Sequence, residues 1–185
     1  MYWSATSFAL PDVQGDSETV YLLQYSTWGH HSLAFYRDDQ LVEFTYGDWN
    51  LFALDKRDTW TGISRMLWPT QGTLGRKAVP WQPGKSICPL FTDCQDVVPF
   101  PAPAQAAQDL YESLQKAFDD RIDEQVFHAE DAVYFVPYDV NYGVWNNCNH
   151  ELAKWLEQLG GKVSGRVFYQ PDFIKGMEPP LPTVS

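Results

Sequence analysis

The chain has 185 residues, of which 44% are hydrophobic, 16% aromatic and 20% charged, a composition that excludes intrinsic disorder and suits one domain. Its formal net charge of −11 repels nucleic-acid phosphates and anionic lipid headgroups, so nucleic acid is not expected as a partner. No apolar run is long enough to cross a bilayer, and the first residues lack the basic and apolar stretches of a secretion signal, so we expect a cytoplasmic protein without a membrane span.

Three strands are predicted in the first quarter of the chain. Residues 18–26 are rich in β-branched and aromatic side chains, which is typical of a strand. Two shorter runs of the same kind, 31–36 and 41–46, lie on either side of the segment Arg37-Asp38-Asp39-Gln40. This arrangement predicts a β-hairpin.

The middle of the chain has no clear periodicity. Between about residues 50 and 103, tryptophans are scattered among turn formers and six prolines punctuate the second half. We interpret this stretch as an irregular aromatic and Pro-rich insertion, whose strands the pattern does not locate.

Two helices are predicted after this insertion. In residues 104–122, Leu110, Leu114 and Phe118 recur on one helical face, and a second helix is expected from about 147 to 159. A strand is expected at 132–136 between them. The sequence thus indicates a single α+β domain over residues 1–177, an antiparallel sheet packed against helices, followed by an extended tail over 178–185.

The three cysteines are too few for a disulfide scaffold. Cys88 and Cys94 lie six positions apart and can bridge in an oxidising compartment, but reduced thiols are expected in a cytoplasm. Neither has a CxxC spacing or a nearby histidine, so no zinc site is expected at these two cysteines, and the leading expectation includes no metal or cofactor.

The third cysteine, Cys148, stands at the predicted entrance of the second helix. Asn147 can cap this helix, which places Cys148 in the first turn, where unpaired N–H groups and the helix dipole favour a thiolate. Cys148 precedes Leu152 by four residues and so lies on the apolar side of the helix. His150 is two residues away and does not face Cys148, so a catalytic base has to come from elsewhere.

His31 and Glu43 are the candidate partners of Cys148. His31 shares a strand face with Leu33 and Phe35. Glu43 shares this face only if the hairpin connection has an odd number of residues, and turn chemistry alone does not decide the loop length. On a shared face the imidazole would take the thiol proton and the carboxylate would orient it, as in a Cys/His/acid triad; otherwise they are a strand histidine and a surface glutamate.

The order and spacing of these residues resemble a known superfamily. His31, Glu43 and the segment Asn147-Cys148-Asn149-His150 resemble the circularly permuted papain-like (NlpC/P60-type) proteins, which include lecithin:retinol acyltransferase-like enzymes and PPPDE-type thiol peptidases. The segments 44–49 and 142–149 are similar to a bacterial domain family of unknown function. The resemblance implies a permuted papain-like fold with Cys148 as nucleophile, His31 as base and Glu43 as the third polar residue.

The leading expectation is a cysteine hydrolase or acyltransferase that acts on an amide, ester or thioester of a small molecule, peptide or acyl chain. Expected substrate-binding or supporting residues are Trp28, Asp48, Trp49, Tyr142 and Asn147. Two alternatives stay open: a catalytically inert binding or scaffolding domain with the same fold, and a metal site formed by Cys148, His31 and Glu43.

Overall fold

In the computed structural model, the described residues are 7–26, 30–56, 69–143 and 145–164. The largest part of the fold is a seven-stranded antiparallel sheet with the strand order β6-β2-β3-β4-β5-β8-β7. Its strands are β2 (Ser17–Tyr25), β3 (His31–Arg37), β4 (Gln40–Asp48), β5 (Thr70–Pro80), β6 (Cys94–Pro103), β7 (Val126–His128) and β8 (Val133–Tyr142). Two short strands, β1 (Ser7–Ala9) and β9 (Lys162–Ser164), form a separate antiparallel pair.

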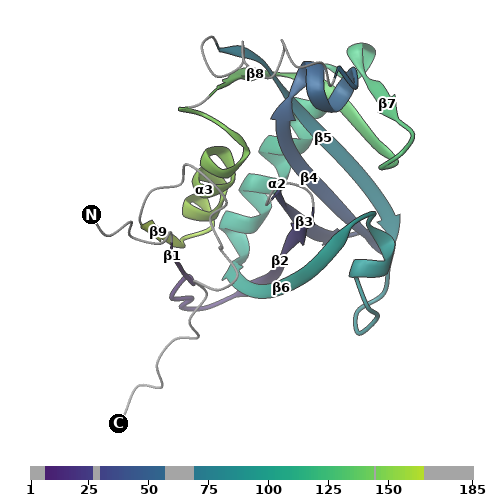
Figure 1. The fold of residues 1–185 in the computed structure, drawn as a ribbon. Coiled ribbons are helices and arrows are strands. Elements are labelled where there is room, and N and C mark those ends of the chain that lie inside the picture. Colours follow the sequence, from purple (N-terminus) through teal and green to yellow (C-terminus); the bar gives the residue numbers. More distant parts are fainter. Residues whose placement is uncertain (1–6, 27–29, 57–68, 144, 165–185) are drawn as a thin grey trace.

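Two helices, α2 (Ala104–Asp119) and α3 (Cys148–Gln158), pack on the same side of this sheet, which we call the helix face (Figure 1). Short helical segments lie in the connections: η1 (Trp49–Ala53), η2 (Cys88–Leu90) and η3 (Ile122–Glu124). The predicted α+β class is therefore confirmed, as are the predicted hairpin and both predicted helices. No helix among the described residues is long and apolar enough to cross a membrane.

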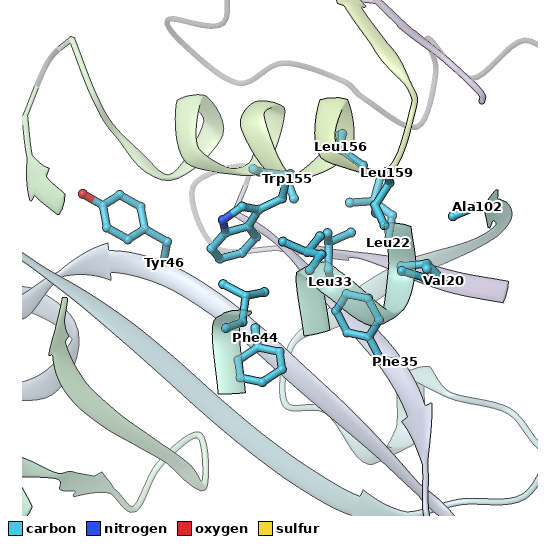
Figure 2. Packing of buried hydrophobic residues seen from close by; sticks show 14 of the residues in the cluster. Val20, Leu22, Leu33, Phe35, Phe44, Tyr46, Ala102, Trp155, Leu156 and Leu159 are labelled. Atoms are coloured by element: carbon cyan, nitrogen blue, oxygen red, sulfur yellow. The ribbon is translucent and has the colours of Figure 1, made fainter. Parts of the chain in front are cut away.

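The main hydrophobic core lies between the helix face and the two helices. Trp155 of α3 points down onto the sheet beside Leu33 and Phe44 (Figure 2). Leu110, Leu114 and Phe118 are all buried on α2, so the spacing read from the sequence is the packing stripe of this helix. The side chains of α3 and of the hairpin β3–β4 thereby belong to one hydrophobic core.

A second, smaller core lies on the opposite side of the sheet, which we call the outer face. Leu23, Ala34 and Leu41 of the sheet are covered there by Trp81, Ile87 and Phe91 from the loop between β5 and β6. A disulfide between Cys88 and Cys94 closes this loop, with 5.1 Å between the two Cα atoms. The expectation that these two thiols stay reduced is wrong in this structure.

The interpretation of residues 50–103 as an irregular insertion is only partly right, because β5 is a central strand of the sheet and β6 is an edge strand. The glycines of β5 conceal it in the sequence, since glycine is rare inside strands. Glycine is needed at these positions because neighbouring groups fill the space that a side chain would take. A Cβ atom on Gly75 would lie 2.5 Å from the Phe135 ring, and one on Gly72 would lie 2.0 Å from the carbonyl oxygen of Val140.

The disulfide yields a first prediction. Replacing Cys88 and Cys94 together by serine frees a seven-residue loop in the unfolded chain, and we expect the free energy of unfolding to fall by about 2 kcal/mol. Urea denaturation of the two proteins measures the difference. Dithiothreitol should lower the stability of the wild type to that of the double variant and leave the variant unchanged; a wild type insensitive to reduction would contradict the prediction.

Candidate functional site

Helix α3 begins with a side-chain cap of the predicted kind. The Asn147 side-chain oxygen accepts hydrogen bonds from the backbone N–H groups of Asn149 and His150, at 3.1 and 3.2 Å. His150 Nδ1 accepts from the Asn147 backbone N–H at 3.4 Å, which completes a reciprocal capping box. Asn147 and His150 thus share the task of ordering the first turn, and Cys148 is the first residue within it.

The sulfur of Cys148 is held between this helix start and the end of β8. The Tyr142 hydroxyl donates a hydrogen bond to it, and so do the backbone N–H groups of Cys148 and Asn149. Burial raises the pKa of the Cys148 thiol and outweighs these three hydrogen bonds, which lower it. The resting group at neutral pH is therefore the thiol, surrounded by donors that stabilise a thiolate once one forms.

Tyr46, near the end of β4, belongs to the surroundings of the Cys148 sulfur. Tyr46 packs its ring 5.8 Å from that of Tyr142, donates its hydroxyl to the Val140 carbonyl at 3.1 Å and accepts from the Asn146 side-chain amide at 3.4 Å. Burial raises the pKa of Tyr46, and neighbouring charges, including that of a Cys148 thiolate, raise it further. Its neutral hydroxyl is thus a stable part of the site.

Asp48 is fully buried two residues beyond Tyr46 and on the same face of β4. Its carboxylate accepts from the Leu51 backbone N–H at 2.8 Å and from the Thr70 hydroxyl. Its charge is among the causes that raise the pKa of Tyr142, after burial and Cys148. A carboxylate is therefore present on the helix face, beside the tyrosine that contacts Cys148.

His31 is buried, with 3% of its surface exposed, at the first position of β3. Side chains alternate along a strand, so His31 points to the helix face with Leu33 and Phe35, which belong to the main core with α3. The pairing of β3 with β4 ends at Leu33 and Phe44, so His31 lies beyond this pair, toward the end of β4 that carries Tyr46. The structure therefore brings His31 to the face that carries Tyr46, Asp48 and Cys148.

Glu43 is not part of this group, and the triad with Glu43 as its acid is corrected here. The hairpin connection is the two-residue turn Asp38-Asp39, because Arg37 pairs with Gln40. An even number of connecting residues puts Glu43 opposite Ala34 on the outer face, away from the side to which His31 points. Glu43 is nevertheless buried, and its Oε1 accepts hydrogen bonds from the Ser32 and Tyr25 hydroxyls.

The other predicted residues divide between the two faces. Tyr142 contacts Cys148 and Asn147 caps its helix, whereas half-buried Trp49 packs with Ala53 and Phe135 in a small cluster on the outer face. Trp28 lies outside the described residues. Among the described residues no group of three or more histidine, cysteine or acidic side chains is placed to hold a metal ion, and Glu43 cannot join Cys148 in one.

Tyr46 and Thr70 are the site residues that the sequence analysis missed. Tyr46 precedes Asp48 by two residues, so strand alternation was the signal that could have placed both on one face. Thr70 reaches Asp48 from a strand that was not predicted.

No family model, curated protein or solved structure matches the chain, so the function has to be inferred from the geometry alone.

Replacing Tyr142 by phenylalanine tests the hydrogen bond to Cys148. The variant loses a donor that stabilises the thiolate, so the pKa of Cys148 should rise further and its alkylation by iodoacetamide should begin at higher pH. Mass spectrometry across a pH series measures this. Tyr138→Phe is the matched control, because Tyr138 is a half-buried tyrosine of the same strand whose pKa, about 12, owes nothing to Cys148. Identical alkylation profiles of Tyr142→Phe and the wild type would contradict the assignment.

Proposed function

We propose that the protein is a thiol hydrolase or acyltransferase in which Cys148 is the nucleophile and His31 the base, on a fold of the permuted papain-like kind. The observation that carries the proposal is the setting of Cys148: a sulfur in the first turn of a capped helix, hydrogen-bonded by Tyr142, on the face toward which buried His31 points. The substrate would be an amide, ester or thioester of a small molecule, peptide or acyl chain.

The proposed reaction has two halves. His31 takes the proton of the Cys148 thiol while the sulfur bonds to the carbonyl carbon, and the carbonyl oxygen becomes an oxyanion. The backbone N–H of Cys148, which the Asn147 cap does not use, would donate to this oxyanion once the sulfur has bonded to carbon. The carbon then releases its amine, alcohol or thiol, which takes the proton from His31. Water, or an acceptor in the transferase case, then gives a proton to His31 and bonds to the acyl carbon. The carbon–sulfur bond breaks, and His31 returns the proton to the Cys148 sulfur.

The raised pKa of Cys148 fits a base-assisted attack better than a preformed thiolate. Burial keeps the sulfur protonated at neutral pH, so a neighbouring base has to remove the proton during the attack. The donors around the sulfur then stabilise the charge as it develops. His31 can remove the proton only if its ring is neutral before the attack.

We propose Asp48 as the carboxylate that supports the imidazolium, in the role first expected of Glu43. Asp48 lies on the helix face, and its two oxygens are oriented by Leu51 and Thr70. A fixed negative charge on the side of the sheet that carries His31 favours the protonated ring. Glu43 has no comparable route to His31 because the sheet separates them.

The second candidate is an inert binding domain that retains the fold. The observation in its favour is the raised pKa of Cys148, since a thiol that stays protonated is a weak nucleophile. The two candidates differ in whether the sulfur can form an acyl intermediate.

The test uses the full chain and p-nitrophenyl acetate as acyl donor. We expect an acetyl group on Cys148, detected by peptide mass spectrometry, which is lost in Cys148→Ala. His31→Asn should slow its formation by about 10² to 10⁴-fold, the usual contribution of a positioned base. His128→Asn is the control, because it removes an imidazole on β7 and leaves the site intact. Acetylation that is equally fast without His31, or no acetyl-Cys148 in the wild type, would leave the binding domain as the function.

A further inference from the structure

The first residues of β3 extend beyond the paired part of the β3–β4 hairpin. The paired register of these two strands runs from Arg37↔Gln40 to Leu33↔Phe44, so His31 and Ser32 precede it. On their other side both residues still pair with β2, as Gln24↔His31 and Leu23↔Ser32. The backbone ladder toward β2 therefore holds His31 on one side, and a fastening toward β4 would hold it on the other.

Side chains supply that fastening from both neighbours of His31. Ser32 Oγ donates a hydrogen bond of 2.5 Å to Glu43 Oε1, and His30 Nε2 lies 2.5 Å from the Thr45 hydroxyl. Ser32 is in β3 and His30 immediately precedes this strand, so the two contacts tie both chain neighbours of His31 to β4. The Tyr25 hydroxyl donates to the same Glu43 oxygen, so β2 is tied into the arrangement as well.

These groups are buried, and this gives the arrangement its rigidity. Ser32 is fully buried and Glu43 is 4% exposed, and burial raises the pKa of Glu43 even though the two hydroxyl donors and Lys77 lower it. Burial also lowers the pKa of His30 to about 4, so its ring stays neutral. A buried carboxyl without hydrogen-bond donors costs free energy of folding. Glu43 therefore keeps the Ser32 and Tyr25 hydroxyls in place.

We propose that the Ser32–Glu43 and His30–Thr45 contacts form an outer-face clamp that positions His31 against Cys148. The clamp rests on the proposed function, in which His31 is the base. Glu43 then has a structural task on the outer face: its oxygen holds the residue after His31, while Thr45 holds the residue before it. A base displaced by about 1 Å can lose about 10²-fold in rate, so such a fastening has a kinetic effect.

A pair of substitutions at Glu43 separates this clamp from a catalytic charge. Glu43→Gln keeps a side-chain oxygen that can accept from Ser32 and Tyr25, so we expect acetylation of Cys148 near the wild-type rate. Glu43→Leu has no acceptor, and we expect the rate to fall by ten- to a hundredfold. If Glu43→Gln falls as far as Glu43→Leu, the carboxylate charge matters and the clamp is overturned.

Thr45 offers a second pair of substitutions, which leaves Glu43 and its hydroxyl donors intact. Thr45→Ser keeps the hydroxyl beside His30 and should behave like the wild type, whereas isosteric Thr45→Val should lose several-fold in the acetylation rate. This pair keeps the proposal testable if Glu43→Leu does not fold, which circular dichroism reports.

A direct readout of His31 distinguishes failure of the clamp from failure of the proposed function. In the ¹H–¹³C NMR spectrum the His31 ring should give one sharp signal in the wild type, Glu43→Gln and Thr45→Ser. It should broaden or double in Thr45→Val and Glu43→Leu. An unchanged signal in Thr45→Val and in folded Glu43→Leu overturns the clamp whatever the reactivity of Cys148. A His31→Asn variant that acetylates normally overturns the proposed function, and the NMR comparison still decides the clamp.

Discussion

The two-residue turn at Asp38-Asp39 is the constraint on which the site depends. Both residues have positive φ, 49° and 60°, the backbone that a tight hairpin turn of this kind requires. The turn pairs Arg37 with Gln40, and a slip by one residue would exchange the two faces of β4. With this register Tyr46 and Asp48 face α3, and Glu43 faces away. The turn therefore decides which side chains of β4 share a face with Cys148, although it lies far from Cys148 in the sequence.

Much of the local structure could be predicted from the sequence, and the parts that could not depend on long-range contacts. The cap at Asn147 and the inward position of Cys148 followed from spacing along one helix. The face of Glu43 did not, because two aspartates suit turns of several lengths. Strand β5 was hidden because Gly72 and Gly75 are required by backbone and side-chain groups of the neighbouring strands, and Thr70 was missed along with it.

The paired cysteines also affect where the protein is expected to work. Disulfides persist in oxidising compartments and are rare in the cytosol. The bond between Cys88 and Cys94 secures the loop that brings Ile87 and Phe91 over the outer face, so it supports the hydrophobic core that they form there. It weighs against the cytoplasmic location expected from the sequence. It also leaves Cys148 as the single free thiol, which makes its labelling unambiguous.

The prolines of β6 have a consequence for self-association. Pro99, Pro101 and Pro103 alternate along this edge strand, opposite Tyr21, Thr19 and Ser17 of β2. Successive residues of a strand direct their N–H groups to opposite sides, so these three sit on the outward side and leave the ladder to β2 intact. This border of the sheet therefore offers an incoming strand few donors, which protects the protein from polymerising edge to edge through β6.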